Sequence, residues 1–282
     1  MEENEQTFSS IDLVGQCLTD EERTKDFQKA IKKTVKSNHT VLDLGTGSGV
    51  MASFAAQSGA KKVVAVEYDP LVAKMAENTF KLNKLDTKIS LLRADARKLS
   101  FDVGTTFDVV ISEMLTTGVV DEHQVQAINN LHEKKFVNSS TIFLPKRQDT
   151  YVSLVNYNSK LHGLKIAMIL HLWNWHNWKQ LKIKKITNQA LLQSLDFSVI
   201  NNENVDSIVE VKATKPGIIN ALYLTSISVL TDKISVGDTE ALNAPMLIPI
   251  PDTKVKKGQV IKVRVSYIYG GGYNKFKAEI VG

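Results

Sequence analysis

The chain has 282 residues, of which 43% are hydrophobic and 23% are charged, and its formal net charge is +5. This composition is that of an ordinary soluble globular protein, and the length suits two domains better than one. The single cysteine, Cys17, excludes an intrachain disulfide, and neither the acidic start MEENEQTFSS nor the short apolar stretches suit a signal peptide or a membrane span, so we expect a cytoplasmic protein.

Helix-like and strand-like patterns alternate through the first half of the chain. We expect residues 1–38 to be helical, with Thr19 or Asp20 as the capping residue. The next expected strands are residues 39–45, 61–69, 88–95, 107–113 and 140–145, and the expected helices are 50–59, 70–85 and 121–136. This order predicts an α/β domain over residues 1–145, with a Rossmann-like, doubly wound parallel sheet.

Beyond Pro145 apolar and polar residues alternate, which is typical of antiparallel strands with one wet face. Turn-like clusters such as TKPG, VKKGQ and YGGGYN separate the strands, and the last of these suits a hairpin better than a phosphate loop. The expected strands are residues 149–157, 207–214, 220–230, 259–269 and 275–281, with some helix around 159–195. The sequence therefore predicts a second domain over residues 146–282 that is β-barrel-like and serves substrate binding or dimerisation.

Charge and aromatic residues are concentrated in the second half. Residues 1–145 hold 17 Lys+Arg against 20 Asp+Glu, and residues 146–282 hold 18 against 10. All three tryptophans lie in 171–185, beside four lysines and two histidines. These features suit a nucleic acid, but a solvated basic surface and a hydrophobic seam or homodimer contact are the interpretations we favour. No Cys or acid stands at ligand spacing from these histidines, so we expect no metal site.

A glycine-rich turn follows the first strand in VLDLGTGSG. Gly45, Gly47 and Gly49 allow close approach of a ligand to the backbone and to helix N-terminal amides. Asp43 precedes the turn and can accept from an ammonium or amide group. Glu67 ends the second strand, where a carboxylate can take both hydroxyls of a ribose. Asp95 ends the third strand, where it can accept from an adenine amino group.

This set of residues resembles the class I S-adenosylmethionine-dependent methyltransferases. An NAD site would prefer GxGxxG, and the interval here is one residue short. The resemblance implies S-adenosyl-L-methionine as cofactor and S-adenosyl-L-homocysteine as product. It also adds the neighbouring residues Thr46, Tyr68 and Ala96 to the cofactor site.

Two glutamates, Glu113 and Glu122, follow the fourth strand in SEMLTTGVVDE. Methyl transfer is an in-line displacement, so the protein must aim a nucleophile at the methyl group and exclude water. Acidic side chains at this strand end suggest a cationic acceptor, and two carboxylates suit the planar fork of a guanidinium. Nucleic-acid amine methyltransferases carry a different motif here, [DNS]PP[YFW]. We therefore expect Glu113 and Glu122 to be catalytic, with Glu113 also close to the cofactor.

The first 150 residues look like the protein arginine methyltransferase family. SEMLTTGVVDE is similar to its double-glutamate loop, and IFLP to its next strand. CLTDEERTKDFQKAI is similar to a family helix whose arginine pairs with the cofactor carboxylate, which makes Arg23 the candidate. The family's THW loop has no counterpart, and NAPMLIP (243–249) occupies that neighbourhood.

The acceptor therefore stays open at this point. Arginine in a protein is the leading hypothesis, ahead of a small molecule or RNA, and a cofactor-binding scaffold without catalysis is the alternative from another class. Two neighbouring residues have simpler interpretations: Asp121 as a helix N-cap and His123 as an exposed first-turn residue.

Overall fold

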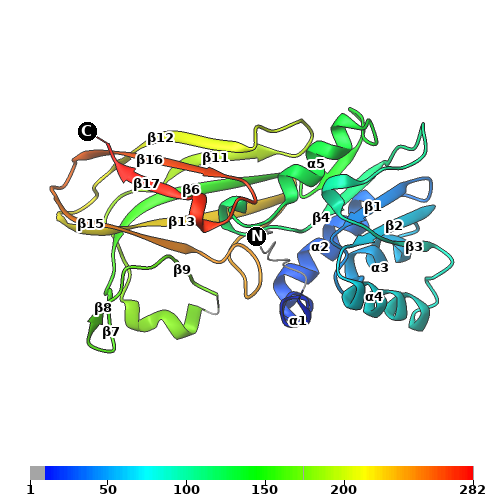
Figure 1. The fold of residues 1–282 in the computed structure, drawn as a ribbon, viewed down its shortest axis with the longest axis horizontal. Coiled ribbons are helices and arrows are strands. Elements are labelled where there is room, and N and C mark those ends of the chain that lie inside the picture. Colours follow the sequence, from blue (N-terminus) through cyan, green and yellow to red (C-terminus); the bar gives the residue numbers. More distant parts are fainter. Residues whose placement is uncertain (1–9, 174, 282) are drawn as a thin grey trace, which may run out of the picture.

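A computed structural model describes residues 10–173 and 175–281. Figure 1 shows an elongated molecule in which an α/β part lies beside a part made almost wholly of long antiparallel strands. In the described part of the chain, no helix combines the length and the apolar character needed to cross a membrane.

Two helices open the described chain: α1 (Ile11–Thr19) and α2 (Glu21–Thr34). The described part of the predicted helical stretch is divided into two helices, because the backbone leaves the helical region at Asp20, with φ −69° and ψ 93°. The Asp20 side chain accepts from the backbone N–H of Arg23 and so caps α2, as one of the two predicted capping residues. The predicted helical residues 1–9 lie outside the described residues.

The parallel sheet has the strand order β3-β2-β1-β4-β5 and is flanked by helices, as predicted. Its strands are β1 (Thr40–Leu44), β2 (Lys62–Glu67), β3 (Ile89–Arg93), β4 (Val109–Ser112) and β5 (Ile142–Leu144). Its helices are α3 (Val50–Gln57), α4 (Pro70–Leu82) and α5 (Gln124–Glu133). The start of α4 is determined by local sequence. Pro70 lies in its first turn, and the N-cap residue Asp69 accepts from Leu71 N at 2.8 Å.

The second half is antiparallel, as predicted. Its larger sheet has the order β10-β6-β13-β15-β9, with β11 on β6 and β14 on β13, and a second sheet has the order β12-β16-β17. The long strands are β6 (Arg147–Asn156), β11 (Ala190–Asp196), β12 (Asn204–Lys212), β13 (Gly217–Thr231), β15 (Met246–Val255), β16 (Val260–Ile268) and β17 (Lys277–Ile280). The described strands form separate sheets without the closure of a barrel.

The segment between β6 and β11, predicted to hold some helix, holds a short 3-10 helix together with short strands. Its described residues hold no α-helix; they form β7 (Lys160–Leu161), β8 (Leu164–Lys165), β9 (Leu170–His171), a 3-10 segment (Trp175–Leu181) and β10 (Lys184–Lys185). Pairing explains the difference, because β9 adds to the edge of β15 and β10 to β6. The remaining short strand, β14 (Ile234–Val236), pairs with β13.

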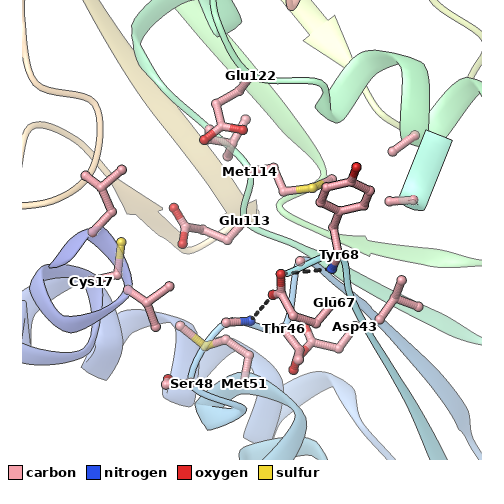
Figure 2. A pocket seen from close by; sticks show the side chains of 18 of the residues that line it. Cys17, Asp43, Thr46, Ser48, Met51, Glu67, Tyr68, Glu113, Met114 and Glu122 are labelled. Atoms are coloured by element: carbon pink, nitrogen blue, oxygen red, sulfur yellow. Dashed lines mark hydrogen bonds between the residues drawn. The ribbon is translucent and has the colours of Figure 1, made fainter. Parts of the chain in front are cut away.

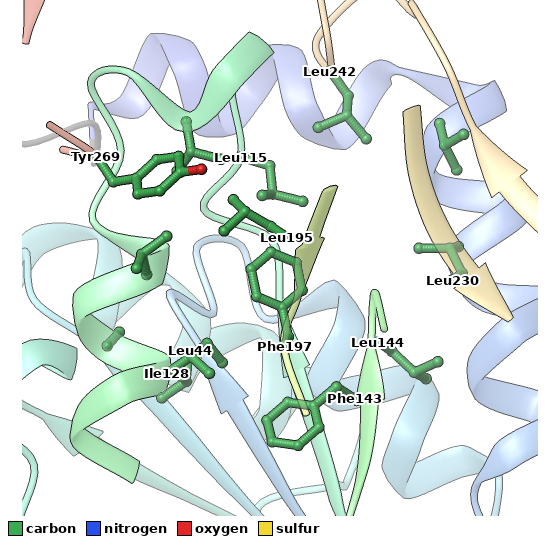
Figure 3. Packing of buried hydrophobic residues seen from close by; sticks show 14 of the residues in the cluster. Leu44, Leu115, Ile128, Phe143, Leu144, Leu195, Phe197, Leu230, Leu242 and Tyr269 are labelled. Carbon is green, nitrogen blue, oxygen red and sulfur yellow. The ribbon is translucent and has the colours of Figure 1, made fainter. Parts of the chain in front are cut away.

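One hydrophobic core runs through both halves. Leu44 and Phe143 come from the parallel sheet, Leu195 and Leu230 from antiparallel strands, and Phe197 from the turn after β11, yet all belong to the same buried cluster (Figure 3). Phe197 is fully buried. Trp178 packs against a second, smaller cluster, so at this tryptophan the predicted hydrophobic seam is confirmed.

Candidate functional site

A cavity opens at the carboxyl ends of β1, β2, β3 and β4, beside α1 (Figure 2). Every predicted site residue except Gly49 lines this cavity. These lining residues are Arg23, Asp43, Gly45, Thr46, Gly47, Glu67, Tyr68, Asp95, Ala96, Glu113 and Glu122. The sheet thus brings together groups that are up to 99 positions apart in the sequence, from Arg23 to Glu122.

The glycine turn joins β1 to α3 with three left-handed residues. Gly45, Gly47 and Gly49 have φ values of 66°, 54° and 81°, which only glycine adopts readily. A Cβ on Gly45 would lie 2.8 Å from Met114 Cγ, so this glycine lets the loop after β4 approach the turn. A Cβ on Gly49 would lie 2.5 Å from the Phe80 ring. Gly49 therefore faces Phe80 on α4 and does not line the cavity, and its predicted part in cofactor binding stays a prediction.

Two buried carboxyl groups stand on either side of this turn. Asp43 accepts from the Thr46 hydroxyl at 2.6 Å, and burial raises the pKa of Asp43 to about 7. Glu67 accepts from three backbone amides, those of Gly47, Tyr68 and Asp69, at 2.9 to 3.0 Å. These three donors fix the Glu67 carboxylate at the floor of the cavity (Figure 2).

Asp95, the acid that follows the third strand, is hydrogen-bonded by Arg97. Asp95 accepts from Arg97 Nε at 3.0 Å and from Arg97 Nη2 at 2.8 Å. Burial alone would raise the pKa of Asp95, but the hydrogen bonds and charge of Arg97 bring it below the usual value. Ala96 lies beside this pair at the cavity wall, and the half-exposed Tyr68 follows Glu67.

An ion pair between Arg23 and Glu113 crosses the cavity. Both side chains are buried, at 6% and 9% exposed, and Arg23 Nη1 also donates to the Cys17 carbonyl at 2.9 Å. The Arg23 Nε is buried without a hydrogen-bond partner. The sequence predicted a role for each residue separately, and their contact was not foreseen.

Glu122 points into the same space as Glu113 (Figure 2). Burial, with a smaller contribution from the charge of Asp121, raises the pKa of Glu122 to about 8. This carboxyl group is therefore mostly protonated at neutral pH. The simpler interpretation of Asp121 as a helix N-cap is wrong, because α5 begins at Gln124 and its N-cap position is His123. The Asp121 carboxylate instead accepts from the Thr116 hydroxyl at 2.5 Å.

The N-cap position of α5 belongs to His123, without a side-chain capping bond. His123 is half-buried and packs against Gly270, so the expectation of an exposed residue is wrong. Gly270 lies in the YGGGYN turn, which joins β16 to β17 as the predicted hairpin. Gly270 N donates to Val119 O at 3.1 Å, so this turn also supports the glutamate loop.

The loop from Glu113 to Glu122 is held largely by the second half of the chain. Thr117 Oγ1 donates to Ala244 O at 2.8 Å, and Gly118 N donates to Ser226 Oγ at 3.0 Å. Tyr267 Oη donates to Gly118 O at 2.8 Å. The two glutamates are thus positioned by residues more than 100 positions further along the chain.

Several residues in or near the cavity were not predicted from the sequence as part of a site. Trp173 lines the cavity, and its ring centroid lies 4.6 Å from that of His171. His171 Nδ1 lies 3.1 Å from Tyr273 Oη, and burial lowers the pKa of His171. His171 lies beside Trp173 and Tyr273 because β9 pairs with β15, and no local sequence pattern predicts that pairing.

The residues just before NAPMLIP (243–249), the segment at the expected place of the family's THW loop, make a specific contact. Thr239 Oγ1 and Ala241 N donate to Asp20 Oδ2 at 2.5 and 2.9 Å. Asn243 follows and is fully buried, and it accepts from Gln148 Nε2 at 2.9 Å. Residues 239–243 therefore connect the start of α2 to the antiparallel sheet.

Comparison with known proteins identifies the family. A family model described as ribosomal protein L11 methyltransferase (PrmA) matches residues 21–185. The chain belongs to this methyltransferase family. It is an S-adenosylmethionine-dependent methyltransferase of class I that resembles the protein arginine methyltransferases, as predicted.

Individual relatives and solved structures are similar to this chain over different lengths. An uncharacterized protein of Methanocaldococcus jannaschii is 31% identical over 263 residues, which are 93% of this chain and 94% of that protein. Protein arginine N-methyltransferase 6 of Danio rerio is 28% identical over 152 residues, which are 53% of this chain and 42% of that protein. The Trypanosoma brucei PRMT1 enzyme–prozyme heterotetrameric complex with AdoHcy has a TM-score of 0.75 at 16% identity, covering 97% of this chain and 98% of that chain. At that identity the likeness concerns the fold alone.

Proposed function

We propose that the chain transfers a methyl group to a guanidinium nitrogen of arginine held between Glu113 and Glu122. The observation that carries this proposal is that two deeply set carboxyl groups point into one cavity beside the glycine turn. A guanidinium stays protonated and offers five donors in a rigid plane, so two carboxylates can hold it from two sides. We also propose residues 1–145 and 146–282 as the cofactor and acceptor domains.

The lining residues fit the cofactor. Arg23 has a buried Nε without a hydrogen-bond partner, which suits the carboxylate of an amino acid. Glu67 would bind the ribose hydroxyls and Asp95 the adenine amino group, with Asp43 near the methionine part. Gly45, Thr46 and Gly47 would line its path, with Tyr68 and Ala96 at the nucleoside. The bound cofactor supplies an electrophilic methyl group on a sulfonium.

The Arg23–Glu113 pair supports an order of events. Glu113 holds a guanidinium within the protein itself, so its surroundings suit that group. When Arg23 turns to the cofactor carboxylate, Glu113 becomes available to an acceptor guanidinium. Breaking a buried ion pair is costly unless both partners find new ones, so the exchange favours binding of the acceptor after the cofactor.

The transfer releases one proton from the acceptor nitrogen. The bond from that nitrogen to the methyl carbon forms as the carbon–sulfur bond breaks, and the N–H proton must leave. Glu122 would accept it, because burial raises the pKa of this carboxyl group to about 8 and so favours its protonated form. Glu113 would stay charged and orient the guanidinium.

Labelled methyl transfer into an arginine-rich peptide and into free arginine tests this proposal. We expect transfer by the wild type, and at least a 100-fold lower kcat/KM for both Glu113→Gln and Glu122→Gln. Glu133→Gln, at an exposed glutamate at the end of α5, is the matched control and should behave as the wild type. Full activity of Glu113→Gln would contradict the guanidinium clamp.

A methyltransferase acting on RNA or on a small molecule is the second candidate. The excess of 18 Lys+Arg over 10 Asp+Glu in residues 146–282 favours RNA. Labelled transfer into RNA but not into peptide would support this candidate. Binding of the cofactor without transfer to any fraction of a cell extract would instead indicate a scaffold. A homodimer is a further expectation, which light scattering of the purified chain tests.

A further inference from the structure

The end of the antiparallel half that lies away from the cofactor cavity gathers exposed lysines. Between Asp149 and Asp196 the sequence holds six lysines and no acidic residue. Strand pairing then brings further lysines to this end, because Lys184 pairs with Asn156 on β6 and Lys254 with Ile218 on β13. The exposed members are Lys160, Lys165, Lys182, Lys184, Lys185, Lys212, Lys215, Lys254, Lys256 and Lys257, which we call the lysine pole.

The turns at this end are hydrogen-bonded to one another. Thr214 N donates to Ile186 O at 2.9 Å, and Gly258 N donates to Ala213 O at 2.8 Å. The lysines that flank these turns therefore belong to one continuous end of the sheet. Figure 1 shows this end at the left, with the α/β part at the right.

A recess opens within the lysine pole. Four lysines line it, Lys160, Lys165, Lys182 and Lys184, together with the neutral hydrogen-bonding residues Asn156, Asn158 and Ser159 and with Tyr157. No carboxylate lines this recess in the described part of the chain. Phosphate oxygens accept hydrogen bonds from amide, hydroxyl and ammonium groups, and this recess presents all three.

Several lysines on the α/β half have acidic partners at salt-bridge distance. Lys29 pairs with Asp26 at 2.8 Å, and both Lys74 and Lys81 pair with Glu77, at 2.8 and 2.6 Å. Among the described residues of the lysine pole, a carboxylate reaches salt-bridge distance only at Lys165, which lies 3.2 Å from Asp252. The ammonium groups of the lysine pole repel one another, and binding of an anionic partner would relieve this repulsion.

We propose that the lysine pole is a docking surface for the phosphate backbone of RNA. The positive charge extends over the ends of several strands, which suits a polyanion rather than a single small anion. Among the described residues at this end, the exposed large apolar side chains are Leu164, Met168, Leu191, Ile218 and Val260. They come from separate strands and turns, whereas insertion into a lipid surface requires a continuous apolar face. The surface is separate from the cofactor cavity, so RNA docking stands or falls independently of arginine methylation.

Fluorescence anisotropy of a labelled single-stranded 16-mer RNA, titrated with the full chain, tests this proposal. The triple variant Lys160→Gln, Lys182→Gln, Lys184→Gln removes three charges from the recess. Each lost phosphate contact lowers the slope of log affinity against log salt by about 0.7 for a single strand, so the slope should fall by about 2. Affinity at low salt should fall at least tenfold.

The matched control removes the same charge from the other half with Lys29→Gln, Lys74→Gln and Lys81→Gln, and its affinity should stay within twofold of the wild type. Equal loss in both triple variants, or no binding by the wild type at low salt, would overturn the proposal. Binding to vesicles of anionic lipid but not to RNA would also overturn it. Calorimetric titration with S-adenosylhomocysteine on the same variants confirms that they are folded.

Discussion

The protonated state of Glu122 makes the stability of the unliganded protein depend on pH. Its pKa is about 8 in the folded protein, against a usual value of 4.5. The folded state therefore binds a proton that the unfolded chain has already lost, and stability falls as the pH rises from about 4.5 to about 8. Glu122→Gln keeps the shape of the protonated form and removes the titration.

The size of the effect follows from these two pKa values. The cost of Glu122 to the folded state should grow by about 2 kcal/mol between pH 6 and pH 8, with most of the total reached at pH 8. Asp43, whose pKa is about 7, contributes in the same direction in both proteins and cancels in the comparison. The variant should therefore gain stability relative to the wild type as the pH rises.

Urea unfolding without cofactor, at half-unit steps from pH 6 to pH 9, measures this difference. The m-values must agree between the two proteins for the free energies to be compared. Glu133→Gln, which removes an exposed carboxyl group at the end of the same helix, should differ from the wild type by a constant amount. Parallel curves for Glu122→Gln and the wild type would refute the reasoning, because they would mean that Glu122 ionises alike in both states.

Three further outcomes follow from the site. The kcat/KM for an arginine acceptor should rise with pH up to about 8, because a guanidinium needs the ionised form of Glu122, and Glu122→Gln should lose this rise. Arg23→Met should destabilise the unliganded protein by about 3–5 kcal/mol in urea unfolding, since it leaves Glu113 buried without its partner, whereas Arg23→Met with Glu113→Gln should recover most of that loss. Gly49→Ala should lower the free energy of unfolding, measured by thermal unfolding, by at least about 2 kcal/mol. This loss should exceed that of Gly59→Ala, because both glycines have positive φ but only a Cβ at position 49 would meet Phe80.

Much of the α/β fold could be predicted from the sequence because its signals are local. A strand such as β1 is a short apolar run that ends in glycines, and α4 carries its own N-cap and first-turn proline. The antiparallel half was harder. Pro249 and Pro251 concealed β15, since proline is rare inside strands, and the long apolar run before Trp173 fits a helix equally well.

The residues of the candidate site likewise fall into those that local sequence signals predict and those that only tertiary packing brings together. The glycine turn, Glu67 and Asp95 follow strand ends in a recognisable order, so they could be named without coordinates. The Arg23–Glu113 pair, by contrast, depends on how α2 packs against the parallel sheet. His171 and Tyr273 meet only because β9 joins the edge of the larger sheet, which is a tertiary event that short-range patterns do not encode.

The glutamate loop ties the two halves into one functional unit. It begins at β4, yet Ser226, Ala244 and Tyr267 supply the bonds that hold its middle. The core is likewise shared, with Phe197 and Leu230 packed in the same cluster as the parallel sheet. Residues that would bind the cofactor thus all come from the first half, whereas the geometry of Glu113 and Glu122 requires both. We therefore expect acceptor binding to require the whole chain, because residues of the antiparallel half hold the loop that carries Glu113 and Glu122.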